Sequence, residues 1–243
     1  MSRRTGIILR IVAIVLVAVT AVFTLLGGVG TTCIAFNAEQ FGQAFAAFIP
    51  YKPTYQLFVY ASLVAGIIGL AATLAIVRGY KWAYGGAVLA ALAGLGTAGV
   101  HMYYSSTLKQ ISFFTAAPEN MRFYVSALTL VVLLVLRLPP IWQGVDFALP
   151  WRGGSGKSTA AGMAAMIVGV ILVTTPMWAA PNHVVDGYNF VNVLEIPLML
   201  GGGSLILGGL GLLALAGAGV SLREARLLTW RWLSSVRIWS RAG

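Results

Sequence analysis

Six long apolar stretches are the feature that most limits how this chain can fold. They lie near residues 7–30, 56–77, 82–104, 121–142, 160–180 and 195–220. Each is long enough to cross a hydrocarbon core of about 30 Å, which takes roughly 20 helical residues. Only 9% of the 243 residues are charged, against roughly 25% in soluble domains, which is too few to cover a surface facing water. The sequence therefore predicts an all-α, polytopic membrane helix bundle with six transmembrane helices.

The basic residues predict which way these helices cross the membrane. If the N-terminus lies inside, the outer loops hold only Lys52, Lys109 and Arg122 of the 16 lysines and arginines, and the others, Arg10 among them, belong to inner segments. Basic residues collect on the cytoplasmic side of membrane proteins. We therefore expect a multi-pass protein of the plasma membrane with both termini in the cytoplasm. The net charge of +10 is spread over short segments between apolar runs, which does not favour nucleic-acid binding.

An interfacial helix is predicted in the first outer loop. Asn37 is placed to cap a helix, and Phe41, Phe45 and Phe48 then share one face until Pro50 ends the pattern. A helix with one aromatic face and one polar face lies in the plane of a membrane surface. We expect the three phenylalanines to face the outer boundary between membrane and water.

The C-terminal segment predicts a second surface helix, on the cytoplasmic side. Ser221 and Glu224 fit a capping box, which marks a helix start. Apolar and basic residues then recur on opposite faces, a pattern that binds membrane surfaces and is attracted by anionic lipids. The residues expected at this surface are Arg223, Arg226, Arg237, Arg241, Trp232 and Trp239.

A stretch rich in glycine and serine divides the chain. Residues 148–159 are typical of a flexible linker. This linker separates a four-helix transmembrane unit at 1–147 from a transmembrane hairpin with the basic tail at 160–243.

Two segments match nucleotide-binding motifs. The second half of the linker resembles a phosphate-binding loop, and residues 94–99 fit a dinucleotide fingerprint. Neither match follows a predicted strand, so a linker and helix packing are the favoured interpretations.

Small residues at helical spacing predict where the helices pack, because they let backbones approach closely in lipid. In the third apolar stretch, Gly86, Gly94 and Ala98 form one stripe. The stripe in the sixth consists of Gly201, Ser204, Gly208 and Gly211. The fourth stretch carries only leucine and valine from 130 to 136, and we expect it to face lipid.

The two histidines are the candidate ligand residues. His101 extends the stripe of the third helix near its outer end and could bind the metal of a haem or pigment, although a b-type haem normally takes two such histidines. The alternative is an interfacial histidine bonded to a hydroxyl or backbone group. His183 and Asp186 could form an outer metal site, or simply belong to a solvated loop. No cofactor is required by the sequence.

No set of residues predicts a catalytic site, and no acidic residue lies in the middle of a span, which argues against ion-coupled transport. The favoured function is a non-catalytic subunit of a larger membrane complex, holding other subunits or further copies of itself. Two alternatives stay open. A transporter or a protein that handles lipids or neutral solutes would have a cavity at the bilayer midplane, between the four-helix unit and the hairpin. A cofactor-carrying subunit would use His101.

The predicted orientation is tested by labelling single-cysteine variants in intact cells, with Cys33→Ala as the background. Ser112→Cys, in an outer loop, should react with a membrane-impermeant maleimide. Ser240→Cys, in the basic tail, should react only after permeabilisation, because the positive charges hold the tail inside. Labelling of the tail cysteine in intact cells would reverse the orientation.

Overall fold

Helices make up nearly all of the computed structural model, which describes residues 2–115, 119–148, 151, 155–179, 183–185, 188–189 and 191–219. The long helices of this part are α1 (Arg3–Gly30), α3 (Lys52–Arg78), α4 (Ala83–Lys109), α5 (Glu119–Leu136), α7 (Ser155–Ala179) and α8 (Asn192–Gly217). The short helices are α2 (Thr32–Asn37), α6 (Pro139–Val145) and two of 3-10 type, η1 (Ala38–Tyr51) and η2 (Phe113–Thr115). Two antiparallel strands, β1 (Val184–Val185) and β2 (Tyr188–Asn189), which were not predicted, lie between α7 and α8.

Five helical stretches of the described residues are long and apolar enough to cross a membrane. The fourth predicted span, 121–142, is broken, because α5 ends at Leu136 and α6 begins at Pro139 with its axis bent by 97°. Proline has no N–H for helix bonding and clashes with the preceding turn, so α5 cannot run through Pro139 and Pro140. Prolines in the first turn of α6 are well tolerated. The prediction of a helix to residue 142 was therefore wrong.

The surface around the helices is apolar. On α3, the Leu57 and Ile67 side chains are 64% and 61% exposed, and on α8 Leu207 is 72% exposed. So many large apolar side chains exposed on the long helices are unusual on a protein in water and indicate contact with lipid or with another protein.

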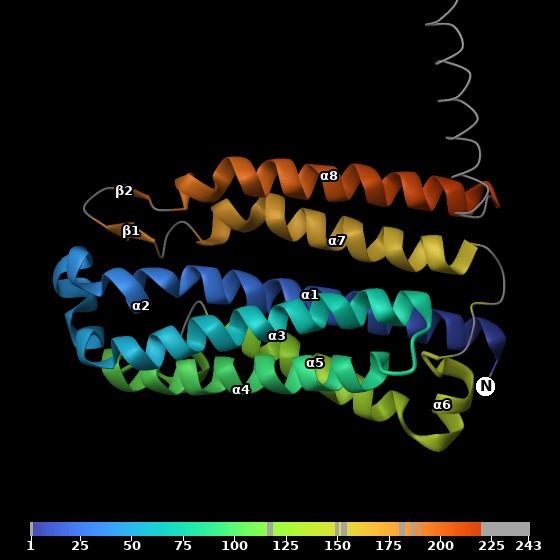
Figure 1. Ribbon diagram of the computed structural model, residues 1–243, viewed down its shortest axis with the longest axis horizontal. Coiled ribbons are helices and arrows are strands. Elements are labelled where there is room, and N and C mark those ends of the chain that lie inside the picture. The colour runs from blue at the N-terminus through green and yellow to red at the C-terminus, as the bar shows by residue number, and fades with distance from the viewer. Residues whose placement is uncertain are drawn as a thin grey trace, which may run out of the picture.

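Helix α1 lies between the α7–α8 hairpin and the other long helices (Figure 1). It contacts α3, α5 and α7, and Ile14 and Val17 on it are almost fully buried in the main core cluster. Its backbone approaches α3 closely, since a Cβ placed on Gly69 would lie 2.8 Å from the Cβ of Ala21. We call the end of the bundle with the α1–α2 and α7–α8 connections the outer end, following the predicted orientation, and the opposite end the inner end.

One face of α5 is buried against α1, contrary to the expectation that this helix faces lipid. Thr20 of α1 and Thr129 of α5 share a hydrogen bond of 2.7 Å between their hydroxyl oxygens, and Leu133 and Leu136 are almost fully buried. Only the opposite face, with Val131, Leu134 and Val135, is exposed. The apolar run therefore serves both the core and the outer surface.

Arg10 joins three segments at the inner end of the bundle. Its side chain is buried, and Nη2 donates to the carbonyl oxygens of Ile76 at 2.9 Å and Phe147 at 2.7 Å. The guanidinium stacks 4.3 Å from the centre of the Trp151 ring, whose indole N–H donates to the Val77 carbonyl oxygen at 2.8 Å. Arg10 is thus a packed structural residue, held by α3 and by the residues before α7.

The predicted linker is partly helical. Helix α7 already begins at Ser155, so the last residues of the 148–159 segment belong to it. Trp151 holds the segment against the inner end of α3 through the Val77 bond.

The aromatic face of the first outer connection packs inward. A helix is present where it was predicted, as η1, but the Asn37 side chain makes no cap bond. Phe41 and Phe48 are 6% and 1% exposed, and Phe48 packs against Tyr55 of α3 with ring centres 5.4 Å apart. The expectation that these rings face the membrane boundary was wrong for Phe41 and Phe48, because a buried aromatic cluster was available on α3.

The α7–α8 hairpin is built on two contacts between glycines. A Cβ placed on Gly162 would lie 2.9 Å from the Gly209 carbonyl oxygen, and one placed on Gly169 would lie 2.6 Å from that of Gly202. Because the obstacle is backbone in both cases, a side chain at either position must push the helices apart. Close packing of this kind is a driving force for helix association in lipid.

Gly169→Ala is therefore expected to destabilise the hairpin by about 1–3 kcal/mol, the usual cost of overpacking. Gly203→Ala is the matched control, because a Cβ at Gly203 meets nothing within 4 Å and alanine favours helix. Thermal unfolding of both variants in detergent measures the difference. Equal stability of the two would show that the glycine contact is not needed.

Candidate functional site: a cavity between the bundle and the hairpin

His101 lies in a closed aromatic cluster within the α3–α4 interface. It is 3% exposed, its ring is stacked on Phe58 at 5.4 Å, and Tyr55 packs edge-on at 5.0 Å. These rings of α3 bury His101 of α4 at the interface between the two helices. A role for His101 as a cofactor ligand stays a prediction.

The two residues of the predicted metal site have different outcomes. His183 is half-buried in the α7–α8 connection, whereas Asp186 lies outside the described residues. Within the described part of the chain, no group of three or more His, Cys, Asp or Glu side chains is placed to hold a metal ion. The predicted surface residues of the tail, Arg223, Arg226, Trp232, Arg237, Trp239 and Arg241, also lie outside it.

The predicted packing stripes fall on different surfaces. In α4, Gly94 faces α5 and α1, since its Cβ would lie 2.9 Å from Ser126 Oγ and 3.0 Å from Thr24 Oγ1, and Ala98 is fully buried. A Cβ on Gly86 would meet the ring of Trp82, the residue before α4. In α8 the contacts to α7 use Gly202 and Gly209. The predicted residues of α8, Gly201, Ser204, Gly208 and Gly211, are exposed on another face.

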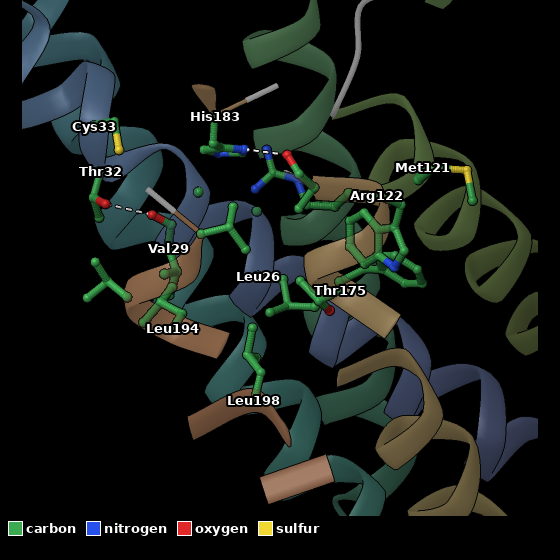
Figure 2. A pocket seen from close by; sticks show the side chains of 17 residues that line it. Leu26, Val29, Thr32, Cys33, Met121, Arg122, Thr175, His183, Leu194 and Leu198 are labelled. Atoms are coloured by element: carbon green, nitrogen blue, oxygen red, sulfur yellow. Dashed lines mark hydrogen bonds between the residues drawn. The ribbon is translucent and has the colours of Figure 1, made fainter. Parts of the chain in front are cut away.

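A cavity of about 330 Å³ lies at the outer end, between α1, α2 and α5 on one side and the α7–α8 hairpin on the other. We call it the outer cavity. Its size is at the lower end of the range of about 300–1,000 Å³ for ligand pockets. Figure 2 shows its lining: Phe23, Leu26, Gly27, Val29, Gly30, Thr32, Cys33, Met121, Arg122, Thr175, Trp178, Ala179, His183, Val191, Val193, Leu194 and Leu198.

The charged part of this lining is Arg122, in the first turn of α5. Its side chain is 2% exposed, and Nη1 donates to the Ser62 hydroxyl oxygen of α3 at 2.7 Å. The guanidinium lies against Gly27 of α1, where an added Cβ would be 2.9 Å from Nη1. Arg122 thus reaches across α1 to α3, and the missing side chain at Gly27 makes the room for it.

His183, from the α7–α8 connection, lies beside Gly30, which is about one turn after Gly27 on α1. An added Cβ at Gly30 would be 3.4 Å from its Nε2, and its Nδ1 is 2.8 Å from the Ala179 carbonyl oxygen. A carbonyl oxygen can only accept, so Nδ1 carries the proton and Nε2 is the nitrogen left for the cavity. In Figure 2 the Arg122 and His183 side chains lie together, away from Leu26 and Leu198.

The outer cavity therefore has a polar end and an apolar end. The polar end offers hydrogen-bonding groups of Arg122 and His183, while Leu26 and Leu198 line the deeper part. A few convergent polar groups in a mostly apolar pocket are the usual form of a small-molecule site. The lining also holds Cys33, which is a free cysteine.

The sequence interpretation assigned Arg122 only to an outer loop. The signal that could have placed it is the series Arg122, Ser126 and Thr129, which share one face of a helix and are all buried here. An arginine that continues a stripe of small hydroxyl side chains faces the inside of a bundle, since an intramembrane charge needs polar partners. The cavity itself has no sequence signal, because its lining comes from α1, α2, α5, α7, α8 and the connection between α7 and α8.

Comparison with known proteins adds no assignment: no family model matches the chain, and neither the curated proteins nor the solved structures include a match to it.

Proposed function

We propose that this chain is an integral membrane protein that binds an apolar or amphiphilic molecule in the outer cavity. The observation that carries the proposal is the position and lining of this cavity, which lies between the four-helix unit and the hairpin, where a lipid- or solute-handling protein was expected to have one. It lies toward the outer end instead of the midplane. Its apolar walls favour a ligand drawn from the bilayer over a polar solute from water.

The proposed setting is the plasma membrane, with both termini in the cytoplasm. It is supported by the distribution of basic residues, which collect at the inner end. In that setting the outer cavity lies within the outer half of the bilayer. The end of the cavity that holds Arg122 and His183 then lies at the depth of the lipid headgroups.

Filling the outer cavity tests the binding proposal. Ala179 is 8% exposed and lines the cavity, so Ala179→Phe is expected to remove most of the molecule that is bound. The matched control is Leu207→Phe, which adds a ring to the exposed face of the same hairpin. Native mass spectrometry of protein extracted from its own membrane, followed by lipid analysis, measures what stays bound. A folded Ala179→Phe variant that carries the same bound molecules as the control would contradict the proposal.

A second candidate, a non-catalytic subunit of a larger membrane complex, is favoured by the open face of α8. Gly201, Ser204, Gly208 and Gly211 are exposed there, and a Cβ at any of the three glycines meets nothing within 4 Å. A helix face of small residues can receive another helix at close range. The partner is then another membrane subunit or a second copy of this chain.

Gly208→Leu is expected to weaken such an assembly, because a leucine would keep a partner helix at a distance. Gly96→Leu is the control, since Gly96 also has nothing within 4 Å but lies on α4. Chemical cross-linking in native membranes, followed by identification of the cross-linked species, measures the effect. Equal cross-linking of both variants would remove the α8 face as an interface.

A further inference from the structure

We infer that the inner end of the bundle binds one anionic phospholipid, with its phosphate at Arg137, where α5 meets α6, and its acyl chains along the exposed face of α5. This site is separate from the outer cavity and from the open face of α8. The inference goes beyond the proposed function and does not depend on it.

The break between α5 and α6 places this arginine. Arg137 is the first residue after α5, and α6 then begins at Pro139 at an angle of 97° to α5. Helix α6 lies at the end of the bundle opposite the strands β1 and β2 (Figure 1). If α5 crosses the membrane, α6 runs nearly along the inner surface, and Arg137 lies at the depth of the lipid headgroups.

The Arg137 side chain is held by two aromatic rings. Its guanidinium carbon lies 4.5 Å from the centre of the Trp142 ring and 5.3 Å from that of Tyr84. Buried Phe147 packs against both rings, and the Tyr84 hydroxyl donates to the Leu133 carbonyl oxygen at 3.3 Å. The rings are therefore a fixed support, and little ordering of the arginine is required when a partner binds.

A contact with a ring uses the positive charge of arginine and not its hydrogen-bond donors. The N–H groups of a guanidinium form a planar fork that matches a phosphate and binds it through two hydrogen bonds. In the part of the chain that the structure describes, the printed contacts of the Arg137 guanidinium are those with Tyr84 and Trp142. The fork can therefore bind a phosphate while the side chain stays on its support.

The charges at the inner end favour an anion. Arg137 is exposed, and the ion pair found among the described residues, Lys52–Glu39, lies at the outer end. Asp146 is the acidic residue at the inner end of the described chain, and its Oδ1 accepts the Ala148 N–H at 3.0 Å. Two further basic side chains are exposed at this end: Arg78 and Lys81. An anionic lipid fits these charges better than one whose headgroup also carries an ammonium group.

The exposed face of α5 supplies the apolar part of the site. Leu134 and Val131 lie about one and two turns before Arg137, so they share its side of the helix, and both are exposed. A phospholipid with its phosphate at Arg137 places its acyl chains beside these two side chains, running from the inner surface toward the midplane. The apolar contact favours a lipid over a free phosphate ion.

Binding of single lipids to the full chain tests the inference. Delipidated protein in a nonionic detergent is titrated with dioleoyl phosphatidylglycerol or with dioleoyl phosphatidylcholine, and native mass spectrometry counts the lipids bound. The first phosphatidylglycerol should bind at least about tenfold more tightly than the first phosphatidylcholine, the effect of one hydrogen bond to a charged group. Equal affinities of the two lipids would overturn the inference.

The Arg137→Gln variant assigns this preference to one residue. It should lower the affinity for phosphatidylglycerol about tenfold, and Arg137→Lys should restore only part of it, because an ammonium lacks the planar fork. The matched control is Arg78→Gln, which removes an exposed arginine at the same end. Its effect should stay below about threefold, since an exposed charge acts there through attraction that salt screens. Equal losses in Arg137→Gln and Arg78→Gln would show that the charge of the whole end is responsible, and the inference would fail.

A photoactivatable phosphatidylglycerol locates the site on the unchanged chain, so the inference stays testable if Arg137→Gln does not fold. With the reactive group in an acyl chain, the main labelled peptide should come from α5, beside Val131 and Leu134. Main labelling of the α7–α8 hairpin would place the lipid elsewhere and overturn the inference.

Glycerol 3-phosphate distinguishes a lipid from a free anion, because it carries the phosphate without the chains. An equal concentration of it should leave the bound phosphatidylglycerol in place. Displacement of the lipid would show that the phosphate alone is recognised, and the partner would then not be a phospholipid.

Discussion

Neighbouring helix backbones approach one another at glycine and alanine, and the rest of the structure depends on this approach. In an apolar solvent the hydrophobic effect does not hold helices together, so close van der Waals contact has to. α1 approaches α3 where Ala21 meets Gly69, and α7 approaches α8 where Gly162 and Gly169 meet Gly209 and Gly202. These contacts build two units, a bundle around α1 and a hairpin, each packed more tightly within itself than against the other.

The outer cavity is a consequence of that division. The hairpin lies against α1, but at the outer end the side chains of the two units leave the outer cavity between them. At the outer end, Gly27 and Gly30 of α1 have another role than the glycines at the helix contacts. They leave space for the side chains of other segments and not for a neighbouring helix backbone. Arg122 and His183 occupy that room, so the same small residues that allow tight packing elsewhere place the polar groups of the candidate site.

The two candidate functions use opposite sides of the hairpin. The ligand proposal depends on the face of α7 and α8 that meets the bundle at the outer end. The subunit proposal depends on the open face of α8. Both can hold for one protein, since a subunit can present a lipid site to its complex, and the variants described above act on one face at a time.

Local sequence determined where the long helices form, while tertiary structure decided which faces meet. Stretches of about 20 apolar residues must become helices in lipid, because each backbone N–H has to bond within its own segment. The sequence could not choose the packing face of α8, where residues 201–203 and 208–209 are all glycine and neighbouring stripes are equally small. The sequence places Arg122 on one helical face with Ser126 and Thr129, but it could not give the contacts of this arginine. Its burial depends on Gly27 and Ser62, distant in sequence, which only the folded bundle brings to it.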